Sequence, residues 1–206
     1  MKNTRTALLL AAVVAALPLA AEPAVGPAAA TGSWTVDKAH SEVGFQVRHL
    51  MAKVRGGFGD FDAAVKIDAS RPEASSVSFV ARTASVNTNE PKRDEHLRSA
   101  DFFDAAKFPE IRFVSKSVKP AGENRFEVTG DLTLRGVTKQ VTLPVTFLGI
   151  QKDPWGNEKA GFETAVTLNR KDFGVNWNKT LDQGGYILGD DVSVTIALET
   201  ARAKTN

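Results

Sequence analysis

The sequence contains no cysteine. This absence excludes disulfide bonds, thiolate catalysis, cysteine-based zinc sites and a lipid anchor on an N-terminal cysteine. An exported domain without disulfides depends on its hydrophobic core for stability. Twelve phenylalanines are available for such a core, and each buried phenyl ring contributes about 1.5–3 kcal/mol.

Long hydrophobic runs are also scarce, because the only one lies near the N-terminus. Lys2 and Arg5 precede the apolar run Ala7–Leu17, and the small residues of Leu19–Ala21 follow it. This layout is typical of a cleavable secretory signal, and the run is shorter than the roughly 20 residues that span a bilayer. We therefore expect a soluble mature protein that is periplasmic or secreted. The predicted segments are a signal peptide (1–21), a flexible leader (22–33), one domain (34–202) and a short tail (203–206).

The chain has almost no excess of charge of either sign. Its 26 basic residues outnumber its 24 acidic ones by two, and Lys2 and Arg5 account for that difference. The mature chain is therefore expected to be neutral. Nucleic-acid recognition requires a clustered excess of lysine and arginine, so we expect no nucleic-acid partner.

Apolar and polar residues alternate along the stretch Ser41–Leu50, SEVGFQVRHL. Val43, Phe45 and Val47 share one parity, and mostly polar side chains occupy the other. This period of two predicts a β-strand with one apolar face. His49 is unusual because it is a polar side chain on the apolar face.

The same alternation recurs along most of the chain and predicts about eight strands. Short, regularly spaced strands favour an all-β antiparallel sandwich or barrel, and an eight-stranded barrel is about wide enough to hold one small ligand. Further runs with an apolar residue at every second position begin at Phe61, Val77, Ile111, Phe126, Val141, Phe162 and Val192.

Two irregularities and one helical segment interrupt this pattern. Phe58 is out of step with Phe61, and the glycines around it predict a β-bulge. Pro144 indicates a strand edge or a second bulge. The segment Asn89–Asp104 has helix formers after an early proline and predicts one or two short helices that cover an end of the sheet, with Ser99 as a second cap.

Five motifs, taken in order, resemble the YceI family of bacterial periplasmic or secreted proteins, and they cover nearly everything from Trp34 to Ala201. The resemblance implies an antiparallel, lipocalin-like barrel with an apolar pore. It also implies an amphiphilic ligand, a polyisoprenoid or an isoprenoid quinone, whose tail lies inside the pore. The motifs are HSEVGFQVRHLMAKVRGGFGDF (His40–Phe61), RDEHLRSADFFD (Arg93–Asp104), FPEIRFVS (Phe108–Ser115), GDLTLRGVTK (Gly130–Lys139) and NRKDFGV (Asn169–Val175).

A pore for a lipid tail needs an apolar lining and one or two polar groups that fix the head group. His49 is a candidate head-group contact, and the alternative is a hydrogen-bonded buried histidine. His96, with Asp94 and Arg98 beside it, is a candidate head-group clamp, and the alternative is a network that fixes the helix to the barrel. Ordinary core packing is the alternative for the apolar residues. The predicted ligand-binding residues are Phe45, Val47, His49, Phe79, His96, Arg98, Phe113, Phe147, Phe162 and Val194.

We expect no metal, no resident cofactor and no catalysis. His40 and His49 would lie roughly 30 Å apart on one extended strand, at ~3.3 Å per residue, and cannot share an ion unless the strand folds back. The remaining alternative is a metal site of one histidine with a carboxylate. No G-x-S-x-G motif occurs. Ser41 beside His40 is a neighbour pair whose side chains point to opposite strand faces.

Three functions remain open at this point. The first is a binding protein that holds an amphiphilic lipid for carriage, storage or stress protection, and that touches membranes only transiently for lipid exchange. The second is a lipid-modifying enzyme that uses His49, or Asp94 with His96. The third is a solid-cored β domain that binds protein through an exposed apolar patch. The oligomeric state is also left open, a dimer included.

Overall fold

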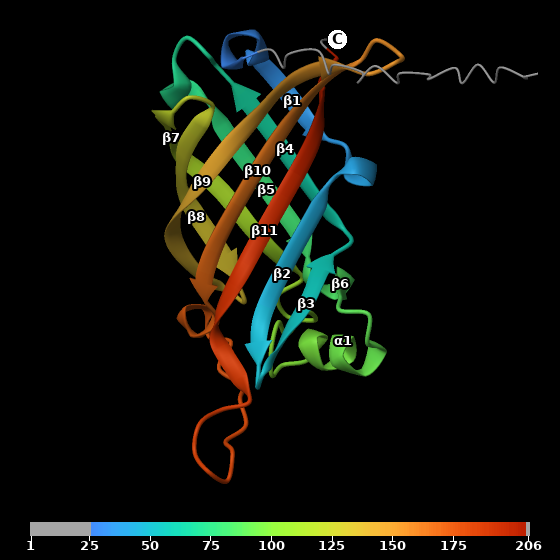
Figure 1. The fold of residues 1–206 in the computed structure, drawn as a ribbon, viewed down its shortest axis with the longest axis vertical. Helices are drawn as coiled ribbons and strands as arrows, with labels where there is room; N and C mark the ends of the chain where they lie inside the picture. The colour runs from blue at the N-terminus through green and yellow to red at the C-terminus, as the bar shows by residue number, and fades with distance from the viewer. Residues whose placement is uncertain (1–25, 205–206) are drawn as a thin grey trace, which may run out of the picture.

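The predicted strands pair into one antiparallel sheet of eleven strands, which closes into a barrel because β11 pairs with both β10 and β1 (Figure 1). The computed structural model describes residues 26–204, so the predicted signal peptide lies outside the described residues. The strands are β1 (Gly32–Val36), β2 (Glu42–His49), β3 (Ala52–Phe58), β4 (Phe61–Ile67), β5 (Ser76–Arg82), β6 (Val86–Asn87), β7 (Glu110–Gly122), β8 (Arg125–Leu134), β9 (Val137–Lys152), β10 (Glu158–Asn169) and β11 (Leu188–Arg202).

Three of the eight predicted strands are each broken into two segments. β1 continues as β2, β3 continues as β4, and β5 continues as β6. The two segments of each broken strand pair with the segments of the next one, since β1 pairs with β4 and β2 pairs with β3. Together with the five unbroken strands they make an eight-stranded antiparallel, lipocalin-like barrel, which confirms the predicted fold.

Each break reverses the parity of the residues that point into the barrel. Phe58 and Phe61 are both buried, and so are Ala81 and Val86. An odd separation puts two residues on opposite faces of an uninterrupted strand, so the chain must leave the sheet between them. The β-bulge predicted at Phe58 is therefore wrong in form, because the strand ends there and restarts after residues 59–60.

Pro144 lies where β9 loses one of its two neighbours. Its partner in β8 is Glu127, whereas the pairing of β9 with β10 begins only at Val145. A proline has no N–H for a strand ladder and is therefore placed at edges. The prediction that Pro144 marks a strand edge is confirmed.

One α-helix, α1 (Pro91–Arg98), lies against one end of the barrel, beside β3 and β6 (Figure 1). It begins with Pro91 as predicted, and Ser99 ends it rather than capping a second helix. Strand β6 is two residues long and has no pairing with β7 among the described strands, so α1 covers an incomplete part of the wall. We refer to this end of the barrel as the α1 end.

The opposite end, which we call the η1 end, is closed by the 3₁₀ helix η1 (Pro27–Ala30). Ala30 is 1% exposed, and its carbonyl accepts a hydrogen bond of 2.8 Å from Nε1 of Trp34. The flexible leader predicted over 22–33 does not hold for its described part, because Ala30 is packed into the barrel. The described chain begins and ends at this end (Figure 1). The other 3₁₀ helices are η2 (Lys38–His40), η3 (Pro72–Ala74), η4 (Thr83–Ser85) and η5 (Arg170–Phe173).

Candidate functional site

A cavity of about 430 Å³ occupies the interior of the barrel, with a lining that extends from Ala30 at the η1 end to Leu97 of α1. This volume lies within the ~300–1,000 Å³ range of small-molecule sites. Aliphatic and aromatic side chains make up most of the wall. The polar or charged residues among its lining are His49, Lys66, Ser75, Arg93, His96, Glu163, Thr164 and Arg170.

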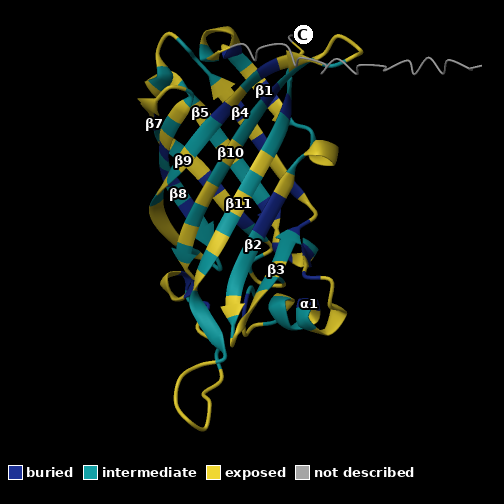
Figure 2. Cartoon of the chain, in the orientation of Figure 1, coloured by how far each residue is buried: buried dark blue, intermediate teal, exposed yellow. Residues whose placement is uncertain are grey.

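Many side chains of β9, β10 and β11 away from the η1 end are only half-buried, although they point into the barrel. Val145, Val166 and Val194 are examples, and their outward neighbours Ala165 and Thr195 are exposed. Figure 2 shows this alternation of intermediate and exposed residues along β10 and β11. Protein interiors are close-packed, so inward side chains of a filled barrel would be fully buried. These strands therefore surround space rather than a solid core.

The η1 end of the cavity is tightly packed. The Phe147 and Phe162 rings lie with their centroids 5.5 Å apart. The guanidinium of Arg202 lies 4.3 Å from the centre of the Trp34 ring, and it donates hydrogen bonds to two carbonyls of the segment that carries η1. The buried cluster at this end consists of Ala30, Trp34, Val65, Phe147, Ile150 and Ala160.

An aromatic cluster lies at the α1 end of the cavity. The His96 ring contacts Phe102 and Trp177 edge to face, with centroid distances of 5.0 and 4.9 Å. Nε2 of His96 lies 2.8 Å from Oδ2 of Asp101. The same histidine lines the cavity. One side chain therefore joins α1 to the irregular segment after β10, and one of its ring nitrogens is already engaged.

Asp94 anchors the first turn of α1. This carboxylate is 6% exposed, and its Oδ1 accepts hydrogen bonds from the N–H and the hydroxyl of Thr88, at 2.8 and 2.5 Å. Nε of Arg93 donates to the same hydroxyl at 2.7 Å. Charge-assisted bonds of this kind are strong and directional. Asp94 thus has a structural role in fixing α1, and it does not pair with His96.

Arg170 organises the irregular stretch between β10 and β11. Its side chain is nearly buried and donates hydrogen bonds to the carbonyls of Val175, Trp177 and Gly189. Burial lowers the pKa of the guanidinium, and the nearby carboxylate of Asp190 opposes that shift. The hydrogen bond from Lys171 is the main cause of the lowered pKa of Asp190. Arg170 therefore places Trp177 against the cavity.

Nine of the ten predicted ligand-binding residues line the cavity, and Arg98 does not. Arg98 donates hydrogen bonds to the carbonyls of Ala84 and Val86, at 2.7 and 2.9 Å. It fixes α1 to the segment that contains β6, so its position differs from that of a head-group contact. The nine residues that reach the cavity are Phe45, Val47, His49, Phe79, His96, Phe113, Phe147, Phe162 and Val194.

Many residues of the cavity wall are not among the predicted ligand-binding residues, and Trp177, Arg93 and Thr164 are three of them. Trp177 lies in a stretch without periodicity, so no strand or helix pattern placed it. Arg93 belongs to the same motif as His96, and its basic side chain was the available signal. Thr164 has the inward parity of β10. The Thr164 hydroxyl is buried and has no hydrogen-bond partner within the described residues, which makes it a free polar group beside the cavity.

A second cluster of titratable groups lies on the outside of the barrel, where η2 separates β1 from β2. Asp37, His40 and Glu199 bring one potential metal-ligating atom each within 4.8 Å of one another. Nζ of Lys159 lies 2.5 Å from Asp37 and 3.2 Å from Glu199. The ammonium group already contacts both carboxylates, so a metal ion would have to displace it. This geometry fits an ion-pair network rather than a metal centre.

None of the helices within residues 26–204 is long and apolar enough to cross a membrane. The model of the family described as "YceI-like domain" matches residues 34–200. A UPF0312 protein of Pseudomonas fluorescens (strain Pf-5) is 40% identical over 204 residues, which are 95% of this chain and 100% of that protein. A UPF0312 protein of Pseudomonas putida (strain W619) is 47% identical over 150 residues, which are 71% of this chain and 78% of that protein.

Solved structures share the same barrel. Burkholderia cenocepacia BcnA is similar with a TM-score of 0.69 and 29% identity, over 80% of this chain and 98% of that one. The YceI protein of Campylobacter jejuni has a TM-score of 0.66 and 33% identity, over 82% and 98%. A polyisoprenoid-binding domain from Saccharophagus degradans, at 14% identity and a TM-score of 0.65 over 82% and 98%, shares the fold alone. The family match over residues 34–200 and the 40% identity across a whole relative establish that this chain belongs to the YceI-like domain family.

Proposed function

We propose that this protein binds an amphiphilic lipid with a long hydrocarbon tail inside the barrel, and that it carries or stores that lipid. The observation that carries the proposal is the hollow, mostly apolar interior, into which half-buried valines, leucines and phenylalanines point from every side. Transfer of a tail from water to such a lining is favourable by ~0.8 kcal/mol per CH₂ group.

The ligand class that fits best is a polyisoprenoid or an isoprenoid quinone. A long branched tail matches a cavity that extends along the barrel, and the related fold from Saccharophagus degradans is a polyisoprenoid-binding domain. His49 and Arg93 would face the head group at the α1 end, where they line the cavity. The protein would act in the periplasm or outside the cell, as the predicted signal peptide indicates.

The two alternative functions have less support. A solid-cored β domain does not fit a barrel that encloses about 430 Å³. An enzyme that uses Asp94 with His96 does not fit either, because Asp94 is bonded to Thr88 and His96 is paired with Asp101. We therefore propose binding rather than catalysis.

The test of this proposal is a cavity-filling substitution on β10. Val166→Trp places a large ring in the cavity, and Ala165→Trp places the same ring on the outer face of the same strand. The delipidated proteins are mixed with an isoprenoid quinone and with a polyisoprenol in detergent, and native mass spectrometry counts bound lipid. We expect the wild type and Ala165→Trp to gain one lipid, and Val166→Trp to gain none.

Thermal unfolding checks that the variants are folded. Val166→Trp fills empty space, so we expect it to be about as stable as the wild type. A folded Val166→Trp protein that still takes up lipid would show that the cavity is not the binding site. A wild type that takes up neither lipid would remove the proposed ligand class.

A further inference from the structure

Large hydrophobic side chains gather at the α1 end of the molecule, on its outside. Leu50 and Met51 form the turn between β2 and β3, and Leu181 and Tyr186 belong to the loop 178–187, which projects beyond the barrel (Figure 1). The N–H of Leu50 donates to the carbonyl of Ile187 at 2.9 Å, so the turn and the loop lie side by side. We call Leu50, Met51, Leu181 and Tyr186 the apolar tip.

Most of the exposed large hydrophobic side chains of the described residues lie in the apolar tip. Met51 is 94% exposed and Tyr186 is 60% exposed. The tip holds four of the seven large hydrophobic side chains that are exposed within the described residues. Single exposed hydrophobic residues are common on soluble proteins, whereas a contiguous group indicates an interaction surface.

Leu50 adopts a backbone conformation that a leucine rarely takes. Its φ angle is +50°, in the left-handed region. Asparagine or glycine occupies such turn positions at lower energetic cost, and a leucine that is 49% exposed gains little packing there to offset that cost. The leucine is therefore unfavourable for folding, and strained residues of this kind are concentrated at functional sites.

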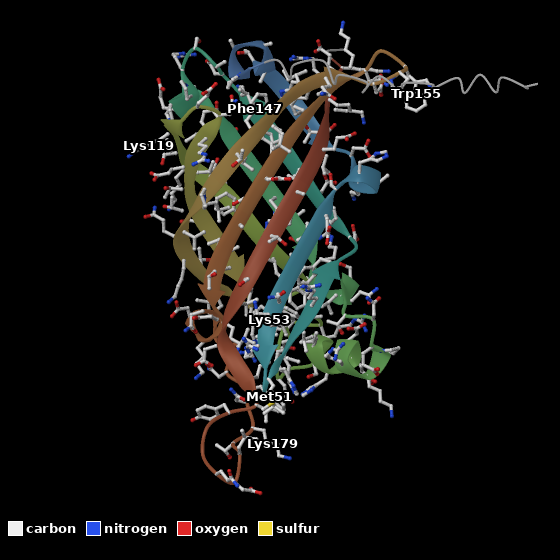
Figure 3. The ribbon with its side chains drawn as sticks, viewed as in Figure 1. Met51, Lys53, Lys119, Phe147, Trp155 and Lys179 are labelled. Carbon is white, nitrogen blue, oxygen red and sulfur yellow. The ribbon has the colours of Figure 1, made fainter. Side chains whose placement is uncertain are left out.

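Basic side chains surround the apolar tip. Arg48 and Lys53 flank the turn, and Lys179 is the second residue of the loop. Asp182 is the acidic residue of these two segments. None of the three basic side chains forms an ion pair within residues 26–204. Figure 3 shows Met51, Lys53 and Lys179 together at this end of the barrel. Exposed apolar side chains among unpaired cations are typical of proteins that lie on anionic bilayers.

The apolar tip adjoins the cavity directly. His49 precedes Leu50 in the chain, and Ile187 follows Tyr186; both His49 and Ile187 line the cavity. Leu188 pairs with His49 across β11 and β2, and it also lines the cavity. At the η1 end, by contrast, Ala30 and Trp34 are packed into the barrel and are each 1% exposed.

We propose that the apolar tip inserts into the surface of an anionic phospholipid bilayer, and that lipid passes between bilayer and cavity at this end. The proposal rests on the proposed function for its cargo, but the docking step is a property of the tip alone. Docking here brings the bilayer beside Ile187 and Leu188, which line the cavity. Arg48, Lys53 and Lys179 supply the attraction to anionic head groups.

The test is co-sedimentation of the purified, delipidated protein with vesicles of phosphatidylcholine, with and without phosphatidylglycerol. We expect binding to the anionic vesicles, and weaker binding when ionic strength rises from about 0.1 to about 1 M, which shortens the screening length from about 10 to about 3 Å. Each basic residue near an anionic surface contributes about fivefold in affinity. The double variant Lys53→Ala, Lys179→Ala should therefore bind roughly 30-fold more weakly, and Met51→Ser about tenfold more weakly.

Three control variants distinguish docking through the tip from effects on folding and from non-specific binding to vesicles. Leu50→Asn relieves the strained turn, so we expect unchanged or higher thermal stability together with weaker vesicle binding. Trp155→Ser and Lys119→Ala remove an exposed aromatic ring and an exposed cation at the other end (Figure 3). These two variants should bind vesicles as the wild type does.

Several outcomes would overturn the docking proposal. One is wild-type affinity in both Met51→Ser and the double lysine variant; another is an equal loss in Trp155→Ser and Lys119→Ala. If Met51→Ser or the double lysine variant differs from the wild type in oligomeric state but not in vesicle binding, the tip would be a contact with a second copy of the chain instead. If the protein takes up lipid from detergent but does not bind vesicles, the docking proposal is contradicted and the proposed lipid-binding function stands. If it binds vesicles but takes up no lipid, the proposed lipid-binding function is contradicted and the docking proposal stands.

Discussion

Four side chains on the outside of the barrel, Asp37, His40, Lys159 and Glu199, join strands that are distant in sequence. Asp37 follows β1, Lys159 is the second residue of β10, and Glu199 lies near the end of β11. The pKa of Asp37 is lowered from 3.8 to about 2, chiefly by the hydrogen bond from Lys159 and then by that from His40. The carboxylate is therefore more strongly stabilised in the folded protein than in the unfolded chain.

This shift predicts a pH dependence of stability. The unfolded chain binds a proton to Asp37 at a higher pH than the folded protein does, so the stabilisation is complete above about pH 4 and is lost as pH falls toward about 2. We expect Asp37→Asn to lower the free energy of unfolding by about 1–2 kcal/mol at neutral pH, since the 22% exposed side chain is partly screened by water. The difference from the wild type should disappear near pH 2 in urea unfolding experiments.

The matched control for this prediction is Asp60→Asn. Asp60 is 60% exposed, and its closest ion pair, with Lys38, is 3.6 Å long. Exposed pairs of this kind contribute little, so we expect a change below about 0.5 kcal/mol at every pH. An equal loss for Asp37→Asn at neutral and acidic pH would assign its effect to something other than charge.

Two histidines with the same predicted role differ in their surroundings. His49 lines the cavity beside the apolar tip, and no hydrogen bond of its ring is found within the described residues. His96 also lines the cavity, but its ring is held by Asp101, Phe102 and Trp177. Parity placed His49 on the inner face, because the period of a strand is fixed. The partners of His96 come from turns and an irregular segment, which have no period to read.

The helix α1 depends on polar anchors for its attachment to the barrel. Leu97 is the only hydrophobic residue of Pro91–Arg98 besides the proline. Asp94 accepts a hydrogen bond from the N–H of Thr88, and Arg98 donates hydrogen bonds to the carbonyls of Ala84 and Val86. A helix with so little apolar surface cannot dock through the hydrophobic effect alone.

The substitution Asp94→Ala tests this dependence. It leaves the N–H and the hydroxyl of Thr88 without their buried acceptor, and we expect a loss of about 1.5–3 kcal/mol in the free energy of unfolding. Hydrogen exchange should accelerate in α1 and β6 more than in β10 and β11. Glu95→Ala, an exposed change on the same helix, is expected to stay within about 0.5 kcal/mol of the wild type. Uniform acceleration across all strands would contradict a local anchor.

At the level of elements, the sequence predicts the strands better than their interruptions. Apolar residues of β10 face apolar residues of β11, as in the pair Val166 and Val194, so a period of two was enough to find both. The breaks are harder to predict, because Ala81 and Val86 have to be recognised as facing the same way although their separation is odd. That relation follows from closure of the barrel, which brings β6 beside β3.

The cavity illustrates the same limit at the scale of the whole molecule. Parity assigned Phe45, Phe79, Phe113 and Val194 to the inner face, but a filled barrel and a hollow one have the same alternation. A hollow barrel differs from a filled one in the distance between its opposite walls. That distance depends on how all the strands pair. The arginine that shapes one end, Arg170, acts through carbonyls of its own irregular neighbourhood, and no pattern of side chains reveals such contacts.

A hollow barrel predicts that ligand and stability are coupled. A ligand present at about 100 times its dissociation constant stabilises the folded protein by about 2.7 kcal/mol, which corresponds to about 5–10 °C in melting temperature for a domain of this size. We expect delipidation to lower the melting temperature by this amount and an isoprenoid quinone to restore it, as measured by calorimetry. Val166→Trp should melt at the same temperature with and without lipid. Identical melting of the empty and loaded wild type would contradict the coupling.

The described part of the chain, residues 26–204, starts and finishes at one pole of the barrel, and Met51 lies at the other (Figures 1 and 3). A purification handle or a fluorescent dye attached after Lys204 would consequently sit a full barrel length from Met51. Immobilised through such a handle, the molecule would present its lysine-flanked pole outward, unobstructed by the support.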